Sequence, residues 1–237
     1  KVVDPYSNKE KEMISFVSND YLGLSHHPEV IKAGIDALEQ YGAGAGASPL
    51  IGGHNFLHEQ LEQEIAHFLK NEYAITYTSG YAANCSTLLA MMGKEDIAIM
   101  DMFTHASVFD GCLCTNTKRF LHNNIDSLVH VLNNSKNFKN RFVIIDGVYS
   151  QDGDIAFLDQ IYAVCKEHDA FLIVDDAHGI GVLGKTGRGI IEDYGLLDKV
   201  DMITGTFSKA FGCVGGYAIA RKEIITLLRY YSRQNIF

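Results

Sequence analysis

The sequence predicts an α/β protein with a mostly parallel central sheet and helices on both faces. Four short apolar runs are continuous rather than alternating, as in strands that are buried on both faces. Amphipathic helical patterns lie between these runs. The chain has 237 residues, of which 47% are hydrophobic, and is therefore long enough to bury a large core. In such a sheet, joined by right-handed crossovers, ligands bind at the carboxyl ends of the strands.

The strands and helices are expected at defined places along the chain. The strand-like runs are YAITYT (73–78), FVIIDG (142–147), AFLIVDD (170–176) and DMITGT (201–206). Apolar residues at helical spacing predict helices over 57–69 and 158–168, and the charged or amide residues at most other positions of the first predict a solvated outer face. We divide the chain into an N-terminal segment, residues 1–40, and a large domain, residues 41–237. Because it begins at Lys1 and stops inside an apolar stretch, we expect it to be a piece of a longer protein.

Composition narrows the classes of function. A formal charge of −9 and a pI near 5.5 disfavour nucleic acid as a partner, although a local basic pocket for a phosphate stays possible. The five cysteines are an odd number and form no CxxC pair, which favours a reducing cytoplasm. No apolar run is long enough to span a bilayer, and the first residues show no signal-peptide pattern.

The run at 73–78 is followed by a candidate phosphate site. Ser79 and Gly80 would turn the chain into a helix whose free backbone N–H groups begin near Tyr81. Such a helix start binds anions well. A plain strand-to-helix turn explains these residues equally well when they are considered alone.

The next two candidate groups begin at the ends of the runs at 170–176 and 201–206. Asp175 and Asp176 end a buried strand, where a carboxylate needs a cation or hydrogen-bond donors unless the strand end is solvated. Thr206, Ser208 and Lys209 follow the last run, and the stretch GTFSKAFG contains no acidic residue that would hold the lysine as an ammonium ion.

Together, a phosphate site, a carboxylate and a lysine at the ends of three strands match what pyridoxal 5′-phosphate requires. Its aldehyde forms a Schiff base with a lysine, its phosphate binds at a helix N-terminus, and a carboxylate keeps its ring nitrogen protonated. The residues therefore predict this cofactor, with Lys209 as the attachment point.

The ordered motifs resemble the α-oxoamine synthases, a branch of the pyridoxal-phosphate enzymes of fold type I, the aspartate-aminotransferase fold. The resemblance runs from about Phe16 to Phe237 and is carried by FVSNDYLGLSHHPEV, YGAGAGASPLIGG, HEQLEQEIAHF, TSGYAAN, DMFTHASVFDG, DGVYSQDGDIAFL, VDDAHGIGVLGKTGRG and TFSKAFGCVGGY. It implies that Lys209 carries the cofactor, that Asp175 pairs with the ring nitrogen, and that His178 contacts the ring hydroxyl while His105 stacks on the ring. The residues that it implies around the phosphate are Ser79, Gly80, Tyr81, Thr206 and Ser208, and those on the substrate side are Asn19 and Ser150.

The resemblance also implies a reaction and partners. An amino acid would displace Lys209, the freed lysine would remove the α-proton, and condensation with an acyl thioester of coenzyme A or of a carrier protein would release carbon dioxide and an α-amino ketone. We expect a cytoplasmic homodimer that shares its active site between subunits. The motif TFSKAFGCVGGY slightly favours a serine palmitoyltransferase-like enzyme, and an 8-amino-7-oxononanoate synthase or a 2-amino-3-ketobutyrate ligase stays open.

The chain departs from the family pattern in places that bear on the subclass more than on the cofactor. These places are Ser48-Pro49 instead of a dipeptide with arginine, the short Asp146 before GVYS, Gln151 after it, and His122-Asn123-Asn124. The family also continues beyond the point where this chain stops, into a C-terminal domain that carries an arginine for the substrate carboxylate.

The sequence also suggests four other functions, each of which is less well supported. GIGVLGKT (179–186) matches the nucleotide-binding pattern GxxxxGK[ST], but Gly187 and Gly189 make a poor first helical turn after it. GAGAGA (42–47) imitates a dinucleotide loop but follows a helical segment. A plain aminotransferase usually carries an arginine where this chain has Tyr217. A degenerate, non-catalytic subunit is disfavoured because the lysine, the aspartate and both cofactor histidines are present.

A metal site is also conceivable, because His54, His58 and Glu62 lie at helical spacing. No fourth ligand and no HExxH pattern accompany them, so we predict no metal.

Overall fold

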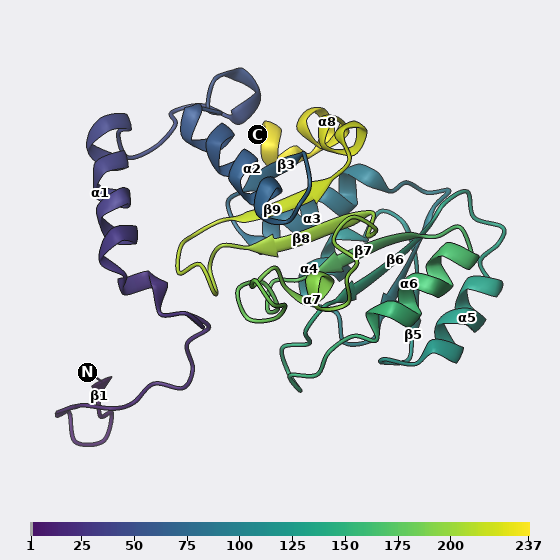
Figure 1. Ribbon diagram of the computed structural model, residues 1–237, viewed down its shortest axis with the longest axis horizontal. Coiled ribbons are helices and arrows are strands. Elements are labelled where there is room, and N and C mark those ends of the chain that lie inside the picture. The colour runs from purple at the N-terminus through teal and green to yellow at the C-terminus, as the bar shows by residue number, and fades with distance from the viewer. Residues whose placement is uncertain (1) are drawn as a thin grey trace.

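A seven-stranded sheet forms the centre of the computed structural model, which describes residues 2–237 (Figure 1). The strand order is β3-β9-β8-β7-β6-β4-β5. All neighbouring pairs are parallel except those of β9, which runs antiparallel to both β3 and β8. The strands are β3 Ala74–Tyr77, β4 Ile97–Asp101, β5 Asn116–Phe120, β6 Arg141–Asp146, β7 Phe171–Asp175, β8 Met202–Thr206 and β9 Gly216–Ala220. The prediction of a mostly parallel α/β sheet is therefore confirmed, and three strands, β4, β5 and β9, were not predicted.

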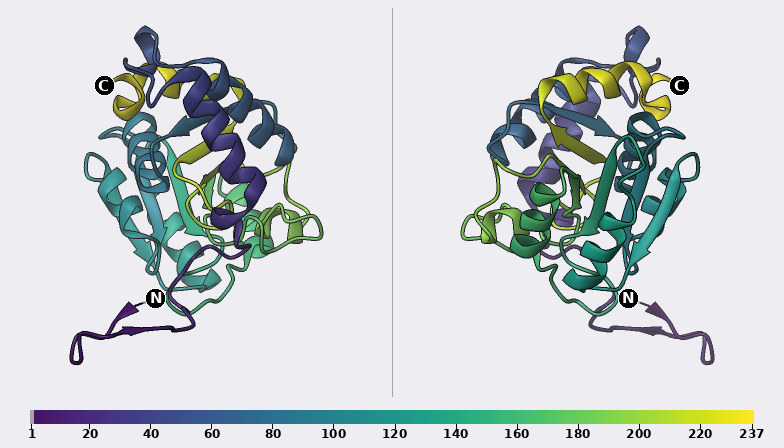
Figure 2. Two further views of the ribbon diagram at one scale, coloured as in Figure 1. Left: turned by 90° about the vertical axis from the view of Figure 1, so that its left-hand side faces the viewer. Right: turned by 90° about the vertical axis from the view of Figure 1, so that its right-hand side faces the viewer.

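Helices cover both faces of this sheet (Figure 2), as the fold class requires. One apolar cluster joins the sheet to α2, α5, α6 and α7, and a second joins it to α3, α4 and α8. The helices are α1 Pro28–Tyr41, α2 Phe56–Phe68, α3 Gly80–Met91, α4 Ala106–Gly111, α5 Ile125–Asn133, α6 Leu158–Glu167, α7 Ile190–Asp193, α8 Lys222–Tyr231 and α9 Arg233–Ile236. Helices α2 and α6 correspond to the two that the apolar spacing predicted.

The strand register aligns polar residues at one edge of the sheet. Asp146 at the end of β6 lies opposite Asp175 at the end of β7, and Asp175 lies opposite Thr204 of β8. The first residue of β9, Gly216, is paired on one side with Tyr77 and on the other with Thr206. The ends of β3 and β8 are thereby held on either side of a single backbone position.

Helix α2 does not have the fully solvated outer face that its sequence predicts. Glu62 is only 4% exposed and binds the Arg229 guanidinium at 2.6 Å. The same carboxylate accepts hydrogen bonds from Thr76, at 2.9 Å from the backbone nitrogen and 3.1 Å from the hydroxyl, and contacts His54 at 3.0 Å. The prediction is wrong at this position because Glu62 joins α2 to β3 and α8 through an ion pair and hydrogen bonds.

Residues 2–52, which we call the N-terminal arm, contain no buried side chain. The arm consists of a small hairpin (β1 Val2–Val3 and β2 Glu10–Lys11), the short 3₁₀ turns η1 Leu24–His26 and η2 Pro49–Ile51, and α1. The hairpin extends away from the sheet (Figure 1), and apolar side chains of α1 such as Ile35 and Leu38 are about half exposed. Across residues 2–237, no helix has the length and apolar character needed to cross a bilayer.

Candidate active site

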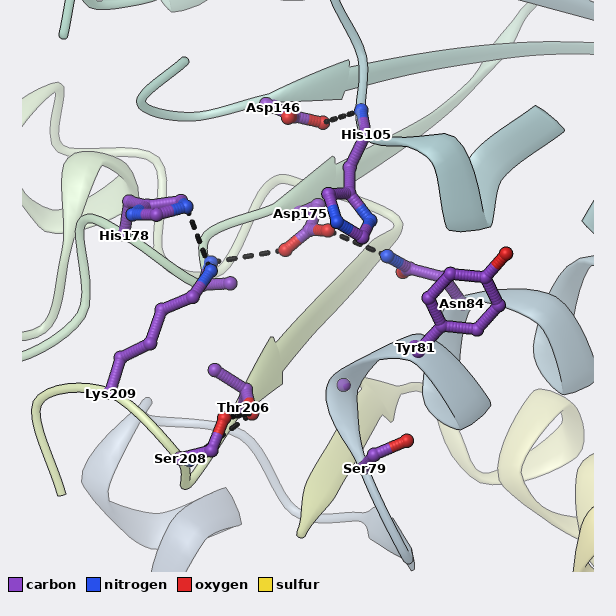
Figure 3. A pocket seen from close by; sticks show the side chains of 12 residues that line it. Ser79, Tyr81, Asn84, His105, Asp146, Asp175, His178, Thr206, Ser208 and Lys209 are labelled. Carbon is purple, nitrogen blue, oxygen red and sulfur yellow. Dashed lines mark hydrogen bonds between the residues drawn. The ribbon is translucent and has the colours of Figure 1, made fainter. Parts of the chain in front are cut away.

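A cavity of about 240 Å³ opens at the carboxyl ends of β3, β6, β7 and β8 (Figure 3). It contains the carboxylate of Asp175 and the amine of Lys209, which are far apart in the sequence. The residues that line it are Ser79, Gly80, Tyr81, Asn84, His105, Asp146, Asp175, Ala177, His178, Thr206, Ser208 and Lys209. Every residue that the sequence singled out for a catalytic or cofactor-binding role therefore lies at this one cavity, and only the two substrate-side residues lie elsewhere.

Lys209 projects into the cavity toward His178 (Figure 3), and its Nζ lies 2.8 Å from the Nε2 of that imidazole. Burial lowers the pKa of Lys209, while the negative charges of Asp175 and Asp146 act in the opposite direction. The expectation that this lysine lacks acidic neighbours thus holds for the local sequence and is wrong in space. The effect of burial on the pKa is larger than the opposing effect of the two carboxylates. The lysine therefore loses its proton more readily than an ordinary lysine does.

Asp175 is held by donors on both of its oxygens. Its Oδ2 accepts a hydrogen bond from Asn84 Nδ2 at 2.6 Å, and its Oδ1 accepts one from the Ala177 N–H at 3.0 Å. The Asn84 amide is itself fixed, because its oxygen accepts a bond from the Thr204 hydroxyl at 2.6 Å and its nitrogen donates to Ser107 at 2.9 Å. This network fixes the direction in which the carboxylate faces the cavity.

Asp176, the next residue, points away from the site into the core. It is 1% exposed and accepts a hydrogen bond from the Ile190 N–H at 3.0 Å, and burial raises its pKa well above the usual range. Both strand-end carboxylates therefore have fixed partners, one at the cavity and one in the core.

Asp146 is a second carboxyl group at the cavity, and it has fewer donors. The only hydrogen bond described for its side chain comes from the His105 N–H at 3.3 Å. Burial, followed by the negative charge of Asp175, raises the pKa of Asp146 well above its usual range. Burial and a neighbouring negative charge both disfavour the ionised form of a carboxyl group, so the neutral form of Asp146 is more favoured than in an exposed aspartate.

His105 is the N-cap residue of α4 and faces the cavity from the side opposite Lys209 (Figure 3). Its Nδ1 lies 2.7 Å from the Ser107 hydroxyl. The ring of Tyr81 approaches it edge-on, at 5.9 Å between centroids, and Tyr81 is in turn held by a hydrogen bond to Asp110 that raises its pKa to about 12. The imidazole is thus oriented before any ligand binds.

The opposite end of the cavity is formed by hydroxyl groups and a helix start. The Ser79 hydroxyl caps α3 by accepting a bond from the Ala82 N–H at 3.0 Å. The hydroxyls of Thr206 and Ser208 lie 2.7 Å apart at the end of β8. A helix N-terminus with convergent hydroxyls is suited to a phosphate group.

Asn19 and Ser150 do not line the cavity. Both are exposed, and Asn19 lies near it only through a 3.4 Å contact with the Tyr21 hydroxyl. Their substrate-side role stays a prediction.

Three cavity residues were given no role in the site from the sequence: Asn84, Asp146 and Ala177. Asn84 could have been found from the sequence, because it is an amide side chain one turn after Gly80, at the start of the helix that follows the first apolar run. Asp146 also carried one, since it ends an apolar run as Asp175 does.

The nucleotide-binding pattern at 179–186 forms a loop that is closed by its own carboxylate. Glu192 accepts hydrogen bonds from the Thr186 N–H (2.9 Å), the Thr186 hydroxyl (2.6 Å) and the Arg188 N–H (3.1 Å), and the hydroxyl bond is the main reason that its pKa falls to about 2. The helix that follows begins only at Ile190 and has four residues. The hydroxyl that a nucleotide site would offer to a metal ion is therefore already occupied.

Glu62, the acidic member of the possible metal site, is held by Arg229 and Thr76. Within residues 2–237 no group of three or more potential metal ligands is brought together.

A family profile described as aminotransferase class I and II matches residues 11–237. The chain belongs to this family. Two similar curated proteins are named 8-amino-7-oxononanoate synthase: the one from Bacillus subtilis is 42% identical over 229 residues, and the one from Geotalea daltonii is 44% identical over 230 residues. Each alignment covers 96% of this chain and 58% of the relative.

Solved structures of the same branch share the fold. The serine palmitoyltransferase of S. paucimobilis superimposes with a TM-score of 0.90 at 36% identity, over 93% of this chain and 56% of that one. The 8-amino-7-oxononanoate synthase of Francisella tularensis gives a TM-score of 0.80 at 29% identity, over 94% of this chain and 62% of that one. Both are α-oxoamine synthases, so the resemblance inferred from the motifs is confirmed. The chain spans a little over half the length of these proteins.

Proposed function

We propose that the protein to which this chain belongs is a pyridoxal-phosphate-dependent α-oxoamine synthase. It would condense an amino acid with an acyl thioester, release carbon dioxide and form an α-amino ketone. The observation that carries the proposal is the single cavity in which Lys209, Asp175 and the first turn of α3 meet.

The residues of this cavity fit the cofactor. The Asp175 carboxylate, fixed by Asn84 and Ala177, would hold the protonated ring nitrogen. Lys209 would carry the aldehyde carbon as a Schiff base, and the first turn of α3 with Thr206 and Ser208 would hold the phosphate. His105, already oriented by Ser107, would lie against the ring face.

The bound cofactor would supply an electron sink for the carbanion formed at the substrate's α-carbon. The chain itself supplies the proton transfers. Lys209 would act as the general base, and burial lowers its pKa below that of an ordinary lysine. His178 accepts or donates a hydrogen bond at 2.8 Å from this amine and is placed to guide its direction.

The relatives favour an 8-amino-7-oxononanoate synthase-like reaction over the serine palmitoyltransferase-like reaction that one motif slightly favours. The product name places an amine beside a ketone near the end of a nine-carbon acid. A decarboxylative condensation would build such a chain from alanine and a seven-carbon acyl thioester with a carboxylate at its far end. We therefore propose alanine as the first amino acid to test.

We also propose that the protein is a homodimer in the cytoplasm. The exposed apolar side chains of the N-terminal arm support a homodimer that shares its active site. The five cysteines, none of which forms a disulfide in the described residues, support a cytoplasmic location.

The test is to titrate the full-length protein, loaded with cofactor, with alanine, serine, glycine and cysteate in separate experiments. We expect a change in the cofactor absorbance with alanine, and thiol release when an acyl thioester is added. A keto acid and the amine form of the cofactor, without thiol release, would show an aminotransferase instead. No absorbance change with any of the four would contradict the condensing role.

A further inference from the structure

Tyr21 reaches the edge of the active site although it belongs to the N-terminal arm. Its hydroxyl lies 2.7 Å from the Nδ1 of His178, and the Nε2 of the same ring lies 2.8 Å from the Lys209 amine. The three groups form one chain of hydrogen bonds that ends at the proposed base. We propose that Tyr21 is a positioning residue that orients His178, and through it Lys209, in the reaction proposed above, on which this inference rests.

The turn that carries Tyr21 is fixed from both sides. The Leu22 side chain lies 3.3 Å from the point where a Cβ on Gly181 would stand, and a Cβ on Gly212 would overlap the backbone at Ser25. Asp20 closes the turn by accepting bonds from Ser25, at 2.5 Å from the hydroxyl and 3.3 Å from the N–H. The turn is therefore packed between the loops that follow His178 and Lys209, so its position depends on both.

A phenol has a chemical advantage at this place because it can both donate and accept a hydrogen bond. When Lys209 is an ammonium ion it donates to Nε2 of His178, and the proton on Nδ1 is donated to the Tyr21 oxygen. When the lysine nitrogen no longer donates, the proton sits on Nε2, and the Tyr21 hydroxyl donates to Nδ1. Tyr21 keeps the imidazole bonded in both tautomers, and a phenylalanine could do so in neither.

The environment keeps these groups in the forms that the proposal needs. Burial raises the pKa of Tyr21, so the phenol keeps its proton. Burial, and then the charge of Lys209, lowers the pKa of His178 to about 4, so the ring is neutral near pH 7. The other charged or titratable groups that act on this ring are Asp175, which raises its pKa, and His105, which lowers it.

The test is Tyr21→Phe in the full-length protein, with Tyr6→Phe as the matched control because it removes the same hydroxyl from a 98% exposed ring. The first measurement is the ¹⁵N resonance of the His178 ring in cofactor-free protein labelled at histidine. We expect the Nδ1 resonance to move to that of a nitrogen without a hydrogen-bond partner in Tyr21→Phe, and to stay unchanged in Tyr6→Phe.

The second measurement is the rate of α-proton exchange of the amino acid in the loaded enzyme. One lost hydrogen bond to a catalytic group predicts a fall of about tenfold in kcat for Tyr21→Phe, with KM for the amino acid little changed. Leu22→Ala, which loosens the turn but keeps the hydroxyl, is expected to lower kcat less and to broaden the Nδ1 resonance.

An unchanged Nδ1 resonance in Tyr21→Phe would overturn the proposal, and so would an unchanged kcat. The resonance is read without cofactor or substrate, so it does not depend on the reaction. If it moves but no thiol is ever released, the contact between Tyr21 and His178 stands and the proposed function fails.

Discussion

Residues 53–237 bury apolar side chains on both faces of a seven-stranded sheet, whereas the N-terminal arm, residues 2–52, buries none. The first region has its own core and holds every group that lines the active-site cavity. The arm has no core and touches the site through one turn, at Tyr21. We therefore expect substitutions in the sheet region to affect the chemistry and the stability of the fold, and substitutions in the arm to affect mainly the geometry of the site. Five substitutions test this difference between the two regions.

The largest effect is expected for Lys209→Ala. The substitution removes the attachment point of the cofactor and the proposed base, so turnover and the absorbance of the lysine-linked cofactor should both be lost. Lys185→Ala is the matched control, since that lysine is exposed in the nucleotide-like loop. Absorbance that survives in the first variant, or is lost in the second, would contradict the assignment.

Asp175→Asn should come next. It keeps the shape of the side chain but removes the charge that would hold the ring nitrogen protonated, and we expect turnover to fall by at least about tenfold while the cofactor stays attached. The exposed Asp198→Asn serves as the control in the same steady-state assay. Equal rates in the two variants would remove Asp175 from the mechanism.

A pair of identical truncations compares the stability of the two regions directly. Leu172→Ala, at a 1% exposed position of β7, should lower the free energy of unfolding by about 2–5 kcal/mol. Leu38→Ala, at a 55% exposed position of α1, should change it by less than about 0.5 kcal/mol. Urea denaturation of both variants measures the difference. A large loss at Leu38 would show that something covers the arm in solution.

The smallest effect is expected for Asp146→Asn, and it depends on pH. Burial and Asp175 raise the pKa of Asp146 in the folded state, so its contribution to stability is complete below the unfolded pKa and is lost as pH rises through the folded one. The asparagine variant should therefore gain stability over wild type as pH increases. The exposed Asp152→Asn should show no such trend in thermal unfolding across the same pH series, and a pH-independent difference at Asp146 would argue against its raised pKa.

Much of the site could be predicted because its residues lie at strand ends, which the sequence marks by continuous apolar runs. Ser79, Asp175 and Lys209 each follow a continuous apolar run, and parallel strands bring such residues to one edge of the sheet. Of the strands that escaped prediction, β4 carries the same signal, since it is a buried apolar run that ends in Asp101, whereas β5 and β9 do not. Strand β5 has mostly exposed residues. Strand β9 is a five-residue run that contains one glycine and two alanines, and it pairs antiparallel with both β3 and β8.

Specific side-chain contacts between distant parts of the chain, outside the strand ends, could not be predicted. Tyr21 and His178 are separated by 157 positions, and the local sequence around either residue does not indicate that they are in contact. The ion pair of Glu62 with Arg229 spans 167 positions and turns a residue that reads as solvated into a buried one. Side-chain periodicity indicates which face of a helix is polar, but not whether another helix later supplies a countercharge.

The loop closed by Glu192 has a consequence for how sequences of this kind are interpreted. Its Thr186 and Arg188 nitrogens already surround an anion, and that anion is a side chain six and four positions downstream. The Glu192 carboxylate therefore stabilises the loop without a bound phosphate. A nucleotide could bind to these nitrogens only by displacing that carboxylate. The pattern GxxxxGK[ST] does not include the downstream position of Glu192. A match to it therefore does not show whether a side chain of the protein already occupies the anion-binding site of the loop.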